Sequence, residues 1–250
     1  MIHLRLAVVI PCFRVRDRIL VLLERIGPEV DRIYCVDDAC PEASGTLVEA
    51  VSRDPRVVVL RHAVNRGVGG AMITGYRRAL EDGADVVIKI DGDGQMDPGL
   101  IAPFVTPIAA GLADYTKGNR FSDPATLRTM PPVRLLGNAV LSCLTKLSTG
   151  YWSVADPTNG FTAIHGTVLR MLPLDVVSED YFFESDMLFR LGVAGAVIAE
   201  VPMRAVYRDE PSSLRIRRIV LPFLARHAAN TVRRLFLPSS STGIPLHRRT

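Results

Sequence analysis

The chain has 250 residues, with 30 Lys and Arg against 26 Asp and Glu, so its formal net charge is +4. A hydrophobic content of 48% and a charged content of 22% exclude a disordered chain. No apolar run reaches the roughly 18 residues that a membrane span needs.

The charge is distributed unevenly. Residues from Arg204 onward hold 10 Arg, no Lys and two acids, whereas residues 1–203 hold 20 basic and 24 acidic residues. This split predicts a globular domain that meets an anionic partner at its C-terminal end, and the alternative is a solvated helix face. The start leads directly into a strand pattern, so we expect no signal peptide. The four cysteines lack metal-binding spacing, which favours reduced thiols in a cytoplasmic protein.

Short apolar runs alternate with helical patterns in the first half of the chain. The predicted strands are 6–10, 33–36, 57–60 and 85–90, and the predicted helices are 16–28, 44–52 with Ser44 as its N-cap, and 70–80. This alternation predicts right-handed βαβ units and an open, mostly parallel sheet. Such sheets bind ligands beyond the carboxyl ends of their strands, where polar clusters follow the predicted strands here.

The second half of the chain is less regular. Helices are predicted at 135–147, with Val140 on the buried face, and at 181–191, and a strand at 197–201. We expect one α/β domain over residues 1–215, a basic amphipathic helical extension over 216–237 and a disordered tail over 238–250.

Two carboxylates, Asp91 and Asp93, lie two residues apart just after an apolar strand, with Gln95 close behind. Mg²⁺ and Mn²⁺ prefer few carboxylates together with phosphate oxygens and water, so this DxD pattern indicates a bridge from protein through metal to a diphosphate. An EF-hand loop is excluded because Met96 stands at its glycine position. The remaining alternative is a polar turn in which Asp97 caps the next helix.

A glycine-rich segment precedes the third predicted helix. Asn65, Gly67 and Gly69 lie where tight backbone and a helix N-terminus favour an anion, which suggests diphosphate recognition. Asp37 and Asp38 follow the second strand, and they either contact a base or ribose or form a helix-capping turn.

Ordered motifs over roughly residues 4–216 resemble the family 2 glycosyltransferases, and in order and spacing the dolichol-phosphate mannosyltransferase-like branch. The motifs are Val9–Phe13, Val36–Asp38, Asn65–Ala71, Asp91–Gln95, Gly118–Phe121, Asp156–Phe161, Phe182–Leu188, Glu200–Met203 and Tyr207–Leu214. The resemblance implies a GT-A fold, a Rossmann-like domain for nucleotide sugars. It also implies inverting transfer from a UDP- or GDP-sugar.

In this resemblance Asp91 and Asp93 hold Mg²⁺ or Mn²⁺, with Gln95 close to the metal. Pro11, together with Asp37 and Asp38, lines the nucleotide pocket. The chain departs from the family at Arg14 and Val15, where an Asn-Glu pair is usual. It also departs at Lys89, just before the DxD, where a neutral residue is more usual. Lys89 either offsets charge near the diphosphate or reaches solvent.

The acceptor of this branch is polyprenyl phosphate, which needs positioning more than a general base. Arginines hold phosphate through paired N–H groups. The resemblance assigns Arg120 to that phosphate, and the further matching positions are Arg134, Arg208, Ser213 and Arg215.

A sugar hydroxyl is the alternative acceptor, and it needs a base. Glu184 and Asp186 lie about 200° apart on a helix, so only one can face the site, and we choose Asp186. A catalytically silent nucleotide-sugar-binding protein is the second alternative.

The C-terminal helix has two unlike faces. Leu224, Ala228, Val232 and Leu235 share one, and Arg226, Asn230 and Arg233 lie opposite. This pattern predicts a helix in a membrane interface, with the enzyme on the inner face of the cell membrane. The alternative is a helix that packs on the domain or pairs two protomers in a homo-oligomer. We expect no nucleic-acid partner.

Overall fold

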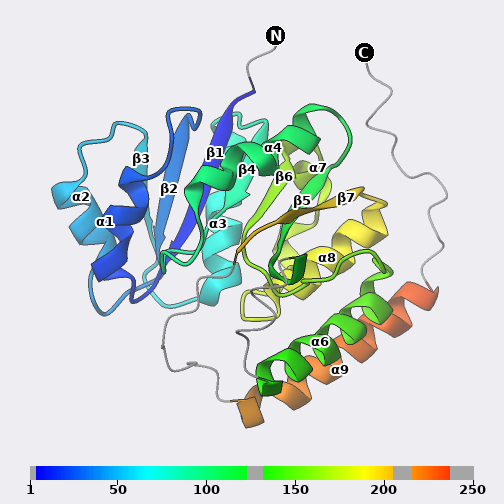
Figure 1. The fold of residues 1–250 in the computed structure, drawn as a ribbon. Helices are drawn as coiled ribbons and strands as arrows, with labels where there is room; N and C mark the ends of the chain where they lie inside the picture. Colours follow the sequence, from blue (N-terminus) through cyan, green and yellow to red (C-terminus); the bar gives the residue numbers. More distant parts are fainter. Residues whose placement is uncertain (1–3, 123–131, 205–215, 237–250) are drawn as a thin grey trace.

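The computed structural model describes residues 4–122, 132–204 and 216–236. Seven strands form one sheet in this part of the chain (Figure 1). They are β1 (Leu6–Cys12), β2 (Arg32–Asp37), β3 (Val57–Arg61), β4 (Val86–Lys89), β5 (Tyr115–Asn119), β6 (Thr162–His165) and β7 (Ile198–Pro202). The helices are α1 (Arg16–Glu24), α2 (Ser44–Val51), α3 (Gly67–Glu81), α4 (Ile101–Ala109), α6 (Pro132–Thr149), α7 (Gly166–Met171), α8 (Phe183–Ala194) and α9 (Ile216–Phe236).

The sheet is mostly parallel, as the sequence predicted. Its strand order is β3-β2-β1-β4-β6-β5-β7, and only β6 among these strands runs antiparallel to its neighbours. The carboxyl ends of β1, β2, β3 and β4 therefore meet at one edge of the sheet, which is where parallel sheets bind ligands.

Both faces of the sheet are covered, which explains the continuous apolar runs of the parallel strands. On β1, Leu6, Val8 and Ile10 pack into the core beneath α1 and α4. Ala7 and Val9 point the opposite way, into the core beneath α3, α7 and α8. This alternation follows from the two-residue period of a strand.

The helix pair α6 and α9 lies below the sheet, side by side (Figure 1). Their contact surface is polar: Thr145, Ser148, His227 and Asn230 are all buried, and His227 Nδ1 lies 2.8 Å from Ser148 Oγ. We call these four residues the α6–α9 seam.

The outward face of α9 is apolar. Leu221 is 73% exposed, and Leu224, Val232 and Leu235 are also exposed. The predicted apolar face of this helix is therefore present, and it faces away from the domain. Asn230, expected on the opposite exposed face, is buried in the seam. None of the described helices is long and apolar enough to cross a membrane.

Two local predictions were wrong. Ser44 is the first residue of α2 and not its N-cap; Ala43, in the left-handed conformation, precedes the helix, and Ser44 Oγ lies 3.1 Å from Cys40 Sγ. Val140 on α6 is half exposed because the buried side of that helix turns its polar residues toward α9.

Candidate active site at the carboxyl ends of the strands

The DxD motif forms a tight turn directly after β4. Asp93 Oδ1 accepts a hydrogen bond from the backbone N of Gln95 at 2.9 Å. Gly92 lies so close to the Pro11 carbonyl that an added Cβ would sit 3.1 Å from it, so the turn packs against the end of β1. Asp91, Asp93 and Gln95 are all partly exposed, and they stand together at the predicted edge. Asp97 accepts from Gly99 N, as the capping alternative for this residue predicted.

Lys89 reaches no solvent. The last residue of β4, it is 1% exposed, and its Nζ lies 2.5 Å from Asp91 Oδ1 and 3.3 Å from Glu184 Oε1. Burial alone lowers the pKa of Lys89, but the two carboxylates outweigh it and hold the pKa above its usual value. We call Lys89, Asp91, Asp93 and Glu184 the strand-end cluster.

Gly160, in the segment before β6, completes the strand-end cluster. Its carbonyl accepts a hydrogen bond from Lys89 Nζ at 3.2 Å. A Cβ at this position would stand 2.2 Å from Asp91 Oδ2 and 2.5 Å from Lys89 Nζ. Only a residue without a side chain fits against the ion pair, which gives a physical reason for the glycine of this motif.

Glu184, rather than Asp186, faces the strand-end cluster. Both lie in the first turn of α8, and the 200° between them turns Asp186 away, as the helix geometry requires. Asp186 Oδ2 accepts hydrogen bonds from Ser178 N at 2.8 Å and Ser178 Oγ at 3.1 Å, and it pairs with Arg190. In this structure Asp186 therefore holds the chain before α8.

A second buried lysine lies on β5, which β6 separates from β4 in the sheet. Lys117 is fully buried, and its Nζ donates to the carbonyl of Asn159 at 2.5 Å. Burial lowers the pKa of Lys117 to about 8, an effect that Glu184 and Asp156 oppose and Lys89 and Arg120 reinforce. Lys89 thus pairs with a DxD carboxylate, whereas Lys117 bonds to a backbone carbonyl.

Asp37 and Asp38 are buried and already hydrogen-bonded. Asp37 accepts from Cys40 N and Gly45 N, both at 2.8 Å. Asp38 accepts from the backbone N of Arg66 and of Gly67, both at 2.8 Å, and from His62 at 2.6 Å. These contacts match the capping-turn alternative and leave a contact to a nucleotide as a prediction.

The glycine-rich segment packs against protein backbone. A Cβ on Gly69 would stand 2.2 Å from the Ser178 carbonyl, and Gly70 N donates to the Glu179 carbonyl at 3.1 Å. Gly67 has φ +82°, and its Cβ would stand 2.7 Å from the Glu179 carbonyl. Asn65 donates to the Asp38 carbonyl at 3.1 Å. The close approach that the glycines allow is thus made by residues 178–179, and diphosphate recognition here stays a prediction.

Residues 178–180, which we call the linking segment, contact three helices in succession. Ser178 is held by Asp186 on α8, and the Glu179 side chain pairs with Arg66 at the start of α3. Asp180 pairs with Arg226 on α9 at 2.7 Å. The sequence placed Arg226 on the exposed polar face. In the structure its side chain is half exposed, and the ion pair with Asp180 links it to the domain.

Arg120 forms a two-pronged ion pair with a buried carboxylate. Its Nε and Nη2 lie 2.7 Å from the two oxygens of Asp156, which is fully buried. The pair fixes the guanidinium near the end of β5. Arg134 lies in α6, and its side chain is outside the described part; Arg208, Ser213 and Arg215 lie wholly outside the described residues. Their assignment to an acceptor phosphate stays a prediction.

The donor set of the turn fits a hard divalent cation. Asp91 and Asp93 offer carboxylate oxygens and Gln95 an amide oxygen, which are the ligand types that Mg²⁺ and Mn²⁺ accept along with phosphate and water. The Asp91 side chain remains 30% exposed although Lys89 engages one of its oxygens. Among the described residues, no group of three or more His, Cys, Asp or Glu gathers as a metal cage.

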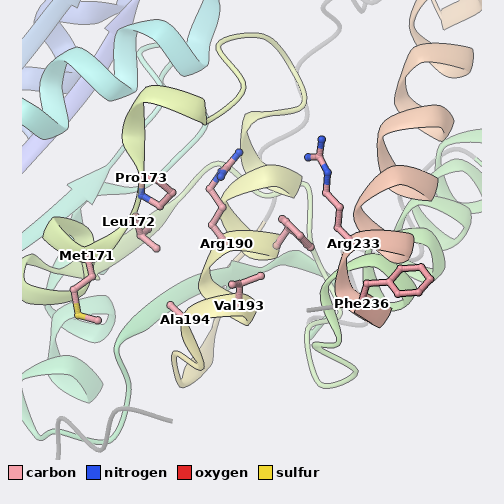
Figure 2. Close-up of a pocket in the computed structure, with 9 residues that line it drawn as sticks. Met171, Leu172, Pro173, Arg190, Val193, Ala194, Arg233 and Phe236 are labelled. Atoms are coloured by element: carbon pink, nitrogen blue, oxygen red, sulfur yellow. The ribbon is translucent and has the colours of Figure 1, made fainter. Parts of the chain in front are cut away.

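A groove of about 620 Å³ lies apart from the strand-end cluster, between α7, the end of α8 and the end of α9 (Figure 2). Its walls are largely apolar, and Figure 2 shows the Arg190 and Arg233 side chains extending from α8 and α9. Arg190 pairs with Asp186, so the groove lies on the side of α8 that faces away from Glu184.

The chain shares its fold with solved glycosyltransferases of GT-A type. Glucosyl-3-phosphoglycerate synthase of Mycobacterium tuberculosis, solved with Mn²⁺, uridine diphosphate and glucosyl-3-phosphoglycerate, has a TM-score of 0.63 at 21% identity, over 94% of this chain and 81% of that one. Mannosyl-3-phosphoglycerate synthase of Rubrobacter xylanophilus has a TM-score of 0.62 at 17% identity, over 93% and 74%. At these identities the likeness concerns the fold.

The chain matches the family described as "Glycosyl transferase family 2" over residues 7–172, and it belongs to that family. It is 31% identical over 82% of its length to undecaprenyl-phosphate mannosyltransferase of Micrococcus luteus, of which it covers 85%. It is 34% identical over 62% of its length to UDP-N-acetylglucosamine–dolichyl-phosphate N-acetylglucosaminyltransferase of Methanococcus voltae. That second match spans 61% of the Methanococcus protein, less than two thirds of its length.

The burial of Lys89 had a signal in the sequence. Residues two apart on a strand share a face, so Lys89 and Asp91 point the same way if the strand continues to its end. A lysine inside the apolar run 85–90 of a two-sided sheet also has no solvent face to reach. Lys117 and the orientation of α8 gave no comparable signal.

Proposed function

We propose that this family 2 glycosyltransferase transfers a sugar from a UDP- or GDP-sugar to polyprenyl phosphate, or to another membrane-linked acceptor, with inversion and with Mg²⁺ or Mn²⁺. The observation that carries the proposal is the strand-end cluster, where Asp91 and Asp93 stand partly exposed beyond β4. The names of the Micrococcus and Methanococcus relatives support the choice of acceptor.

Asp91 and Asp93, with Gln95 close by, would hold the metal. When bound, it would neutralise the charge that develops on the departing nucleoside diphosphate. Lys89 holds Asp91 in place through its hydrogen bond to Oδ1, and the same ammonium group also pairs with Glu184. A phosphate acceptor is already an anionic nucleophile, so the residues around it need to orient it and exclude water. Arg120, fixed by Asp156, is our candidate for this task.

The outward apolar face of α9 supports a membrane-linked acceptor. Leu221 and Leu235 are more than 70% exposed, at 73% and 71%, and they lie on the same helix as Arg226 and Arg233. Apolar side chains flanked by arginines are what a helix in an anionic membrane interface requires. We therefore propose that the protein sits on the inner face of the cell membrane with α9 against the lipid.

A sugar hydroxyl is the second candidate acceptor, and one observation favours it. Glu184 is a carboxylate beside the strand-end cluster with 17% of its side chain exposed, where a base for a hydroxyl would be needed. The sequence had assigned that role to Asp186, whose carboxylate is engaged by Ser178 and Arg190. We therefore propose Glu184 as the base in this second candidate.

Transfer assays test the main proposal. Purified protein is incubated with radiolabelled UDP- and GDP-sugars, undecaprenyl phosphate in vesicles, and Mn²⁺, Mg²⁺ or EDTA. We expect lipid-linked product with a divalent cation, and a loss of about 100-fold or more for Asp91→Ala and Asp93→Ala. Full turnover in those variants would contradict the metal bridge, and nucleotide-sugar binding without turnover on lipid or sugar acceptors would favour a silent binding protein.

Two substitutions separate the acceptors. Glu184→Gln should abolish transfer to a hydroxyl and only weaken transfer to a phosphate. Asp186→Asn should weaken both equally, since its contacts hold the linking segment.

Flotation with anionic vesicles tests the membrane surface. Leu221→Glu combined with Leu235→Glu should abolish co-flotation without changing the fold. Leu112→Glu is the matched control, because Leu112 is 72% exposed in the loop after α4. Equal flotation of the double variant and the control would rule out α9 as the anchor.

A further inference from the structure

A buried lysine bonded to one of two metal-binding carboxylates has a consequence for the order in which ligands bind. Lys89 Nζ lies 2.5 Å from Asp91 Oδ1, so one oxygen of the DxD pair already has a cationic partner before any metal arrives. The Lys89 side chain is 2% exposed, so its ammonium group cannot leave for solvent. It therefore remains in the site as a fixed positive charge.

The fixed charge is held from three sides. Asp91, the Glu184 carboxylate at 3.3 Å and the Gly160 carbonyl at 3.2 Å surround the Nζ atom. The absence of a side chain at Gly160 keeps this packing closed, since a Cβ would stand 2.5 Å from Nζ. Rotation of Lys89 away from Asp91 would leave an unpaired charge in the sheet, which is costly.

A divalent cation at Asp91 and Asp93 would lie close to this ammonium group. The two positive charges repel each other in surroundings that screen poorly, and Lys89 also occupies an oxygen that the cation would otherwise use. A nucleoside diphosphate carries enough negative charge to offset that repulsion. The metal and the diphosphate thus depend on each other at this strand end.

Building on the proposed function, we propose that Lys89 is a positioning residue that blocks tight binding of the metal alone. The metal and the nucleoside diphosphate then bind as a unit, with Asp91 contributing one oxygen and Asp93 the rest of the carboxylate ligation. The chain holds three lysines, and Lys89 is the one whose ammonium group contacts the DxD within the described structure.

Manganese binding without turnover tests this inference. The free Mn²⁺ signal in electron paramagnetic resonance is titrated with protein, first alone and then with UDP or with GDP. The wild-type protein should bind Mn²⁺ weakly alone and at least about tenfold more tightly with the matching nucleotide. Lys89→Met should bind Mn²⁺ alone about tenfold more tightly than wild type and should lose most of the gain from nucleotide.

The double variant Lys89→Met/Glu184→Gln is the control for misfolding of Lys89→Met, because it removes the Glu184 charge together with the buried cation that pairs with it. It should show the same tight binding of Mn²⁺ alone. Lys117→Met removes a buried lysine that does not contact the DxD, and Lys146→Met removes a lysine on α6. Both should bind Mn²⁺ as wild type does.

The outcomes distinguish failure of the proposed function from failure of the role assigned to Lys89. If neither nucleotide brings Mn²⁺ to the wild-type protein, the proposed function fails. If nucleotide does so, but Lys89→Met and the double variant bind Mn²⁺ alone no more tightly than wild type, the role assigned to Lys89 is wrong. Equal gains in Lys117→Met would also overturn it, because the effect would then be one of general charge.

Discussion

The strand-end cluster and the α6–α9 seam both place side chains against their usual preference, in opposite directions. At the strand end, Lys89 carries a charge into the interior of the sheet, and Glu184 of α8 lies against it. At the seam, polar residues turn inward while Leu221 and Leu235 point outward. At the strand end, Lys89 pairs with both Asp91 and Glu184, whereas Thr145 Oγ1, His227 Nε2 and Asn230 Nδ2 have no hydrogen-bond partner among the described residues.

The comparison separates two reasons for breaking the ordinary inside–outside pattern. Disturbing a pair of buried charges lowers stability strongly, because removal of one partner leaves the other charge buried without compensation. Unpaired buried polar atoms cost about 1–3 kcal/mol each as they stand, so the seam is a weak contact that a lipid surface on its outer side can reinforce. The charge pairs at the strand end therefore fix the positions of their side chains, whereas the seam holds α9 only weakly against α6.

The largest effect is expected at the buried pair beside the strand end. Asp156→Asn leaves the Arg120 guanidinium without its fully buried partner, and we expect a loss of about 3–5 kcal/mol in the free energy of unfolding. Urea denaturation measures it. Asp54→Asn is the matched control, because the Asp54–Arg56 pair is also two-pronged but about a quarter exposed, and it should lose about 1 kcal/mol. Equal losses would remove the distinction.

The next effect comes from Gly160. Gly160→Ala places a Cβ 2.2 Å from Asp91 Oδ2 and 2.5 Å from Lys89 Nζ, so the ion pair must separate. We expect transfer to fall by about 100-fold, with a loss of about 1–3 kcal/mol in stability from overpacking. Gly137→Ala on α6 is the control, since nothing lies within 4 Å of its Cβ position, and it should be neutral or slightly stabilising. Wild-type activity in Gly160→Ala would contradict the tight packing.

The third prediction concerns pH and the seam. Burial lowers the pKa of His227 to about 4, below the unfolded value of about 6.5. Between these values the unfolded chain binds more protons, so stability is fully present above pH 6.5 and declines as the pH falls toward 4. The contribution of His227 should be about 2 kcal/mol smaller at pH 5 than at pH 7.

Thermal or urea unfolding at both pH values measures this contribution. In His227→Gln that part of the pH dependence should vanish, while His165→Gln should keep it. A pH dependence that is unchanged in His227→Gln would show that the seam does not exclude the charged imidazole.

The smallest effect is expected where the seam region meets the domain. Arg226 and Asp180 form an ion pair at 2.7 Å, but both side chains are about half exposed. A double-mutant cycle with Arg226→Ala and Asp180→Ala should give a coupling of about 1 kcal/mol or less. A coupling above about 2 kcal/mol would indicate that α9 is fastened to the domain as firmly as the strand-end residues are to each other.

The sequence predicted the structure correctly where a single physical rule decided the outcome. The runs at 6–10 and 33–36 lie in strands because a two-sided parallel sheet leaves a strand no polar face. The position of the Asp91–Asp93 turn at the edge of the sheet was predictable because the turn directly follows an apolar strand. By contrast, α4 was not anticipated because Pro103 and Pro107 stand inside it, and β6 is only four residues long.

The choice between Glu184 and Asp186 could not be made from the sequence. Helix geometry says that two residues 200° apart face different ways, but which one faces the sheet depends on how α8 is rotated against α3 and α6. The fate of Asp37 and Asp38 was equally undetermined, because a carboxylate after a strand can bind backbone amides or a ligand. The backbone amides of Gly45 and Gly67 lie within reach of these carboxylates in the folded chain.

The linking segment joins parts of the protein that act at different places. Ser178, Glu179 and Asp180 are consecutive, yet they reach α8, the start of α3 and α9. The carbonyl groups of Ser178 and Glu179 also seal the glycine-rich turn. Part of any force that pulls α9 away from the body of the protein is therefore delivered, through the carboxylate of Asp180, to the loop that closes the start of α3.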